Sequence, residues 1–421
     1  MSLIKSLLIA SVVMLMPAAI LAQTNFRWVG TISGDWNTST NWLDDSTGDA
    51  VGTVPNSTNV SAVFRQSSSN NTLNLATGVS LQSMQFTATP SAYTIGGQGI
   101  TFASGGSVSV ASTVTTNQTI NSNITVAGAF GITNSSATTG QTLTLGGTMI
   151  LASNALTVNT TANTTLSGAI TGVSTSSIVK SGTDTLTLSA ANSAYAGSVT
   201  ANAGTLNVSG SGTTGTGTVT VNSGGTLAGT GTVTGATTIG IGGTIRGDFG
   251  TGTGNLTLNG NTTLTGSASA GASASNIRTR LAISGGTITS NSKLSLSGST
   301  TLNIDQVMGT GRAINVYLDN DAGLTNGQTY TVALATAGSN SQFLRNGANN
   351  NGANFVSTDT NLFSGSGLNT FTNVLLTRGT GTLDITFTSF TAVPEPSLMF
   401  GAAAGLFGLV AVRRKLVKRV V

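Results

Sequence analysis

One short pattern recurs along most of the chain, from Asn71 to Ile304: an apolar residue, a small polar residue and a second apolar residue. Successive side chains point to opposite faces of a β-strand, so this period of two predicts strands with one buried face. Gly, Asn and Ser lie between the triplets, as is typical of tight turns. The triplets are Leu73-Asn74-Leu75, Val108-Ser109-Val110, Leu143-Thr144-Leu145, Leu186-Thr187-Leu188, Val219-Thr220-Val221, Leu256-Thr257-Leu258 and Leu294-Ser295-Leu296.

The spacing of related triplets indicates the architecture. Gly204-Thr205-Leu206 recurs at Gly225-Thr226-Leu227 and again at Gly243-Thr244-Ile245, in two steps of similar length. Gly286-Thr287-Ile288 follows at about twice that distance, which we interpret as two further periods. A repeat of about 20 residues built from short strands is typical of one turn of a parallel β-helix. A β-sandwich would show the same alternation, but it does not need the regular spacing.

We therefore expect an all-β protein with a right-handed parallel β-helix over residues 67–300. The pattern changes over residues 301–391, where strand-like pieces alternate with Asn-rich loops, and we interpret this part as a C-terminal β cap. The expected strands there are Ala313–Leu318, Thr329–Ala335 and Leu383–Thr388.

Composition and charge exclude several functions. Charged residues make up 7% of the chain, and the net charge of +4 comes from the two ends. Residues 23–393 hold ten basic and eleven acidic residues without a basic run, so we expect no nucleic-acid partner, which would need clustered cations. The absence of Cys and His excludes disulfides, Ser-His-Asp triads and imidazole metal ligands. We expect no cofactor and no metal.

Residues 1–22 have the three regions of a secretory signal peptide: Lys5, the apolar core Leu7 to Met16, and Pro17 before a short cleavage segment. We place cleavage between Ala22 and Gln23, which implies signal peptidase and the general secretion machinery as partners. A retained N-terminal anchor is the alternative.

All three tryptophans, Trp28, Trp36 and Trp42, lie in the next segment, residues 23–66. Large aromatic side chains can close the open end of a β-solenoid, whose first coil would otherwise expose its core and strand edges. We interpret residues 23–66 as such a cap. Exposed tryptophans could instead stack on sugar rings, which would make the protein a carbohydrate-binding module.

The last segment, residues 392–421, has three parts in a fixed order. Val393-Pro394-Glu395-Pro396 interrupts regular structure, Leu398 to Val412 is uncharged, and Arg413, Arg414 and Lys415 begin a basic stop. The apolar stretch spans roughly 22 Å as a transmembrane helix, shorter than the roughly 30 Å hydrocarbon layer. The alternative interpretation of this segment is an ordinary C-terminal membrane anchor.

This three-part order resembles the PEP-CTERM sorting signal. The resemblance implies a transient membrane intermediate, removal of the tail by an exosortase, and a Gram-negative host. It also implies a link to exopolysaccharide, which is a further candidate partner.

A second resemblance covers residues 178–208. Lys180, Gly182, Leu186 and Leu188 precede Tyr195-x-Gly197 and then Gly204-Thr205-Leu206, and this order is similar to the autotransporter-associated β-strand repeat. Asp184 stands where that repeat has its second glycine. The resemblance implies a passenger-like β-helix and no chemistry.

Three further motifs are weak candidates for binding sites. Arg246-Gly247-Asp248 spells an integrin-binding tripeptide, but a Gly-rich turn of this kind arises easily by chance. Asp319-Asn320-Asp321-Ala322-Gly323 resembles the start of a calcium loop, yet Tyr330 stands where the bidentate Glu is needed. We interpret it as a turn, and Asp44-Asp45 with Asp49 as a polar loop.

Some β-helices are polysaccharide lyases or hydrolases, and this is the third functional alternative. Between Arg65 and Asp305 the only acids are Asp184 and Asp248. About three coils separate them, or roughly 15 Å, whereas paired carboxylates work at roughly 5–10 Å. We therefore expect no catalytic residues and no enzyme. The sequence predicts an exported structural or adhesive β-helix protein of the cell surface or extracellular matrix.

Overall fold

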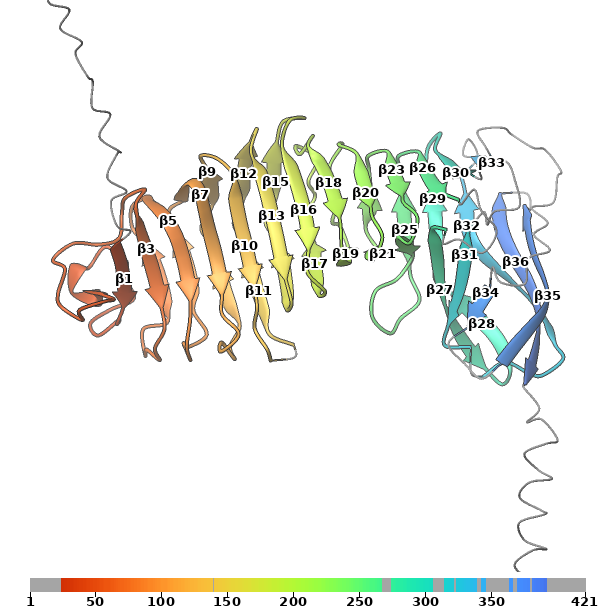
Figure 1. The fold of residues 1–421 in the computed structure, drawn as a ribbon, viewed down its shortest axis with the longest axis horizontal. Helices are drawn as coiled ribbons and strands as arrows, with labels where there is room; N and C mark the ends of the chain where they lie inside the picture. Colours follow the sequence, from red (N-terminus) through yellow and green to blue (C-terminus); the bar gives the residue numbers. More distant parts are fainter. Residues whose placement is uncertain are drawn as a thin grey trace, which may run out of the picture.

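The computed structural model describes residues 24–391, except 139, 267–273, 306–313, 322, 339–341, 346–362, 366–368 and 379–380. Within them the chain forms a long stack of coils that runs from β1 at one end to the β35–β36 hairpin at the other (Figure 1). The predicted cleavage point Ala22–Gln23 and the whole of residues 392–421 lie outside the described residues.

Each coil in the first half of the shaft contains three short strands, one for each face of the stack. One coil consists of β12 (Met149–Ala152), β13 (Ala155–Thr160) and β14 (Asn163–Leu166). The next consists of β15 (Ile170–Gly172), β16 (Ser177–Ser181) and β17 (Thr185–Leu188). Corresponding strands pair in parallel, β12 with β15, β13 with β16 and β14 with β17. The predicted parallel β-helix is confirmed.

The first face is a continuous parallel ladder from β1 to β33. Besides β13 and β16 it contains β1 (Thr24–Trp28), β3 (Val60–Phe64), β5 (Val79–Phe86), β7 (Ile100–Val110), β10 (Phe130–Asn134), β18 (Ser198–Ala201), β20 (Val219–Val221), β23 (Thr237–Ile239), β26 (Thr262–Thr265), β30 (Thr301–Asp305) and β33 (Gln342–Arg345).

The second face is also parallel. Besides β14 and β17 it contains β4 (Thr72–Leu75), β6 (Thr94–Gly97), β8 (Gln118–Ile120), β11 (Thr142–Leu145), β19 (Gly204–Val208), β21 (Gly225–Gly229), β24 (Thr244–Arg246), β27 (Asn276–Ser284), β31 (Asn315–Asp319) and β34 (Phe363–Gly365).

The third face has two parallel stretches. The N-terminal stretch contains the first halves of β5 and β7, then β9 (Ile124–Val126), β12 and β15. The C-terminal stretch contains β22 (Thr232–Val233), β25 (Asn255–Leu258), β29 (Lys293–Leu296) and β32 (Thr329–Ala337). Between these two stretches lie isolated β-bridges, such as the one that joins Gly172 to Tyr195.

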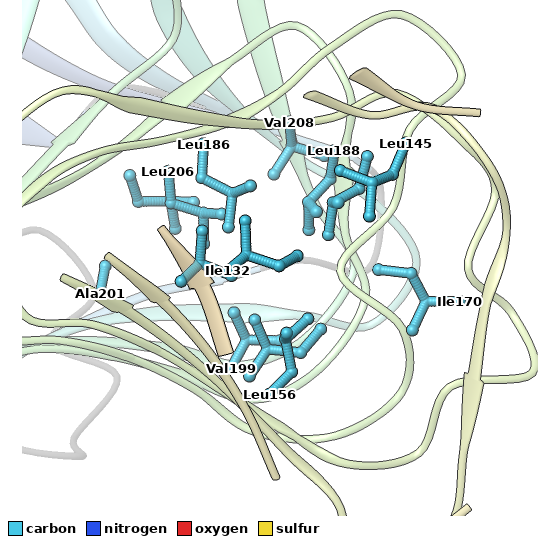
Figure 2. Close-up of a cluster of buried hydrophobic side chains, with 14 of the residues drawn as sticks. Ile132, Leu145, Leu156, Ile170, Leu186, Leu188, Val199, Ala201, Leu206 and Val208 are labelled. Atoms are coloured by element: carbon cyan, nitrogen blue, oxygen red, sulfur yellow. The ribbon is translucent and has the colours of Figure 1, made fainter. Parts of the chain in front are cut away.

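The alternation predicted from the sequence places its side chains as expected. In each of the seven triplets both apolar residues are buried, while the central polar residue is exposed or half-buried. Figure 2 shows side chains from all three faces, including Leu186, Val199 and Ile170, pointing into the same interior. Each fully buried Leu or Ile stabilises the fold by about 1.5–3 kcal/mol, so the stacked ladders supply the core.

The predicted spacing is confirmed for two steps and wrong for the third. Gly204 pairs with Gly225 and Thr226 with Thr244, as the triplets predict. Thr287, however, lies in β28 (Thr287–Asn291), which pairs antiparallel with β27 outside the coil ladder. The next coil partner of Thr244 is Asn276, more than one period further on, because extra segments enter the coils here.

The two ends of the shaft differ from its middle. At the N-terminal end β1 also pairs antiparallel with β2 (Trp42–Asp44), which follows the short 3-10 helix η1 (Ser39–Asn41). At the other end the parallel pairs continue past residue 300, through β30, β31, β33 and β34. There β32 pairs antiparallel with β36 (Thr382–Thr391), and β36 with β35 (Asn369–Arg378).

Within the described part of the chain, we find no helix with the length and apolar character that spanning a membrane requires.

Candidate functional site

The residues of the predicted sorting tail and of the signal peptide lie outside the described residues. This applies to Val393-Pro394-Glu395-Pro396, to Leu398 to Val412, to the basic residues from Arg413, and to Ala22 and Gln23. Their individual roles stay predictions.

The three tryptophans form one buried cluster at the N-terminal end of the shaft. The ring centroids of Trp28 and Trp42 lie 5.0 Å apart and those of Trp36 and Trp42 4.6 Å apart, both edge to face. Phe64 packs against Trp36 and Trp42, and the solvent exposure of all three indoles is 0%. The alternative of sugar stacking on Trp28, Trp36 and Trp42 is wrong, because no ring face is open to a ligand.

Each indole also has a partner for its N–H group, as buried tryptophans need. Trp28 donates to the carbonyl of Asn70 at 3.1 Å, and Trp42 to that of Trp36 at 2.8 Å. Trp36 donates to the carbonyl of Pro55 at 3.3 Å. The Trp28 bond joins β1 to the segment before β4, and the other two hold β2 and Trp36 together within residues 23–66. This is the arrangement expected of a cap.

Lys180 occupies an inward position in the middle of the shaft. On the first face it lies between Val158 of the preceding coil and Ala201 of the following one. Its side chain is fully buried, and its Nζ donates to the carbonyls of Ser181 at 2.6 Å, Gly182 at 2.8 Å and Ala203 at 3.2 Å. The ammonium therefore joins the turns of two successive coils.

Burial lowers the pKa of Lys180 from 10.5 to about 8, against an opposing effect of the nearby Asp184 carboxylate. A depressed lysine pKa is also found in catalytic amines. Here, however, the three carbonyls take all three donors of the ammonium, and the side chain has no exposed surface. Lys180 is a structural residue.

The other residues of this repeat serve close packing. Tyr195 donates its hydroxyl to the carbonyl of Ser198 at 2.9 Å, and a Cβ at Gly197 would lie 2.6 Å from that hydroxyl. Gly204 has a φ of +63°, and a Cβ there would lie 2.5 Å from the carbonyl oxygen of Asp184. The glycines of the motif thus mark places where coils approach too closely for a side chain.

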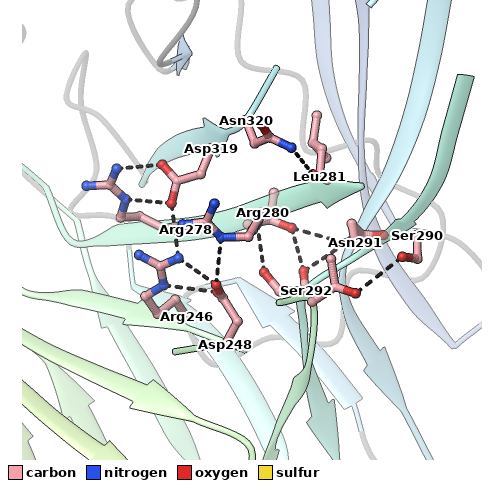
Figure 3. A network of polar contacts seen from close by, with 12 residues as sticks. Arg246, Asp248, Arg278, Arg280, Leu281, Ser290, Asn291, Ser292, Asp319 and Asn320 are labelled. Carbon is pink, nitrogen blue, oxygen red and sulfur yellow. Dashed lines mark hydrogen bonds and ion pairs between the residues drawn. The ribbon is translucent and has the colours of Figure 1, made fainter. Parts of the chain in front are cut away.

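Five charged side chains gather on the outer side of the second face: Arg246 of β24, Arg278 and Arg280 of β27, Asp248 and Asp319 (Figure 3). We call them the charged cluster. Arg246 binds both oxygens of Asp248, at 3.0 and 2.6 Å, and Arg278 binds both oxygens of Asp319, at 3.3 and 2.5 Å.

Further contacts join the two pairs of the charged cluster. Arg246 reaches Asp319 at 3.2 Å, and the Nε of Arg280 reaches Asp248 at 3.2 Å. The guanidinium of Arg278 also lies over the ring of Tyr317, 5.4 Å from its centroid. Burial alone would lower the pKa of Arg246, but its hydrogen bond to Asp248 and the charges of Asp248 and Asp319 raise it instead.

This geometry removes the integrin-type interpretation of Arg246-Gly247-Asp248. A receptor would need both charges free in solution, but here they bind each other. The Asp248 side chain is 1% exposed. The tripeptide serves to fix the base of the segment between β24 and β25.

The two aspartate loops also have structural partners. Asp319 lies in the charged cluster, and Asn320, at a φ of +65°, donates its amide to the carbonyl of Leu281. Asp44 accepts hydrogen bonds from Ser46 and Thr47, which lower its pKa, and Asp45 pairs with Arg65 at 3.0 Å. No group of three acidic side chains that could hold a metal occurs among the described residues.

The sequence did not predict the charged cluster. Arg246, Arg278 and Asp319 are far apart along the chain and lie on three successive strands of the second face, so only the coil register brings them together. The alternation on β27 does place Arg278 and Arg280 on the outer side of the strand. This alternation is the one feature of the sequence that indicates part of the cluster.

A parallel β-helix whose repeat residues serve packing belongs to the structural class of β-solenoid proteins. Comparison with known families supports this class. Residues 178–208 match the passenger-associated-transport-repeat, and residues 392–415 match the PEP-CTERM protein-sorting motif. The search of the curated proteins gives no match. The chain is thus an exported cell-surface β-helix protein, and its sorting motif implies machinery of the exosortase type.

Proposed function

We propose that this protein is a structural or adhesive component of the outer surface or extracellular matrix of a Gram-negative bacterium. In this proposal the secretion machinery exports the chain and signal peptidase removes residues 1–22. Leu398 to Val412 then holds it in the inner membrane until an exosortase cleaves near Pro394-Glu395-Pro396. The observation that carries the proposal is the match of residues 392–415 to the sorting motif, behind a shaft of packed repeats.

We further propose that the shaft is not an enzyme. Both oxygens of Asp248 accept hydrogen bonds from arginines, which leaves no carboxylate there for acid–base work. A hollow of about 280 Å³ lies beside Asp184, and its other lining residues are Ser, Thr, Ala, Gly and Asn. A paired-carboxylate mechanism needs a second acid, and this hollow has none.

Intact-mass measurement of the protein from envelope and medium fractions tests the processing steps. The expected product begins near Gln23 and ends near the Pro394-Glu395-Pro396 motif. A Glu395→Ala variant should retain its tail in the membrane fraction, while the conservative Thr391→Ser control should be processed normally. Mature surface material that still carries Leu398 to Val421 would contradict the proposal.

A further inference from the structure

Two segments interrupt the regular coils and lie next to each other on one side of the shaft. The first is residues 247–254 between β24 and β25, which project in Figure 1, and the second is the β27–β28 hairpin. The hydroxyls of Thr253 and Ser290 lie 3.3 Å apart and join the two. We call them the lateral arm. Insertions into the repeats of a solenoid often form its binding face.

The lateral arm carries an exposed aromatic ring on a fixed base. Phe249 is 47% exposed, whereas its neighbour Asp248 is buried in the charged cluster. Gly247 lies so close to strand β29 that a Cβ there would be 1.9 Å from the carbonyl oxygen of Lys293. The buried Asp248 and the tightly packed Gly247 therefore fix the backbone that precedes Phe249, while the ring itself is exposed to solvent.

The charged cluster beside this ring has more cations than anions. The cluster has three guanidinium groups and two carboxylates. Arg280 donates a hydrogen bond to Asp248 from its Nε only. Among the described residues, nothing accepts a hydrogen bond from the two terminal nitrogens of Arg280, whose side chain is 24% exposed. These nitrogens form a fork that fits a carboxylate.

We propose that the lateral arm binds an acidic polysaccharide. The ring of Phe249 packs against the C–H face of a sugar, the free fork of Arg280 pairs with a uronate carboxylate, and the exposed hydroxyls of Thr251 and Thr253 meet sugar hydroxyls. A single free fork needs only one uronate carboxylate at the site. Nucleic acid would need several phosphates neutralised, and residues 23–393 carry ten basic against eleven acidic residues.

This site belongs to the shaft and does not depend on how the tail is processed. The test uses the full-length chain in detergent, polygalacturonate as the acidic probe and dextran as the neutral one. Phe249→Ala and Arg280→Gln should each weaken polygalacturonate binding roughly tenfold, the loss expected for one stacking contact or one charge-assisted bond. Higher salt should weaken the wild-type complex further.

Two matched substitutions serve as controls. Ile241→Ala removes an equally exposed apolar side chain from another turn, and Arg65→Gln removes an arginine paired with Asp45 at the far end of the shaft. Both should bind as the wild type does. Circular dichroism checks that every variant is folded. Equal affinity of wild type, F249A and R280Q would overturn the proposal, as would absent polygalacturonate binding or equally tight binding of single-stranded DNA.

Discussion

Lys180 illustrates how a single residue of this fold can contradict its local pattern and still be satisfied. The inward position calls for an apolar side chain, as in Val158 before it, yet a lysine fits because the following coil has the small Ala201 there. The three carbonyls around its Nζ then replace the lost water.

The depressed pKa of Lys180 predicts a dependence of stability on pH. Below about pH 8 the amine is charged in both the folded and the unfolded state. Between about 8 and 10.5 the folded state has released the proton and the unfolded state still holds it, so the free energy of unfolding rises with pH. The expected gain is about 2 kcal/mol between pH 8 and 10, measured by urea unfolding of residues 23–392.

Lys180→Met should abolish this gain, while Lys293→Met should leave it intact. The comparison ends near pH 10, because burial raises the pKa of Tyr93 and of Tyr195 to about 12. Above pH 10 the unfolded tyrosines lose protons first, and the protein becomes less stable. An unchanged gain in K180M would show that Lys180 is not the group responsible.

At the scale of one strand, β20 offers a direct test of the coil register. Val219 is 1% exposed and pairs with Val199 and Thr237, whereas Thr220 is half-buried on the outer side. Val219→Asp should cost several kcal/mol, because an unpaired carboxylate enters a dry core. Thr220→Asp should change stability by about 0.5–1 kcal/mol.

Denaturant midpoints of residues 23–392 with each change give the comparison. Neighbouring coils are coupled in a solenoid, so the Val219→Asp lesion should also lower the protection of amides in the adjacent strands β18 and β23. The same midpoint for both variants would be incompatible with the inward position of Val219.

Strands and coil length could be predicted wherever the repeat is regular. The triplets predicted the buried positions because alternation is a local property of each strand, and their similar spacing predicted the register from Leu206 to Ile245. Beyond Ile245 the spacing fails, since residues 247–254 and the β27–β28 hairpin have no counterpart in earlier coils. The charged cluster and the position of Phe249 depend on those insertions, so no sequence period could reveal them.

At the scale of the whole molecule, the shaft is expected to have no hydrolytic or lyase activity. Purified residues 23–392 should leave a panel of acidic and neutral polysaccharides uncut, because the two acids of the central shaft are isolated or bound by arginines. Reducing-sugar release and unsaturated products are the measurements. Reproducible product formation that disappears in Asp184→Asn or Asp248→Asn would refute this expectation.

The two covered ends of the shaft have a mechanical consequence. Beside the tryptophan cluster β2 pairs antiparallel with β1, and at the other end β36 and β35 pair antiparallel beyond β32. An antiparallel strand thus covers the first-face ladder at its N-terminal end and the third-face ladder at its C-terminal end. These antiparallel strands disfavour the addition of coils from a second molecule, so the number of coils in one chain sets the length of the rod. At roughly 4.8 Å per coil the ladder from β1 to β33 spans roughly 60 Å. A chain held at its C-terminal end, as in the proposed membrane intermediate, would carry its tryptophan cluster at the far end of this rod.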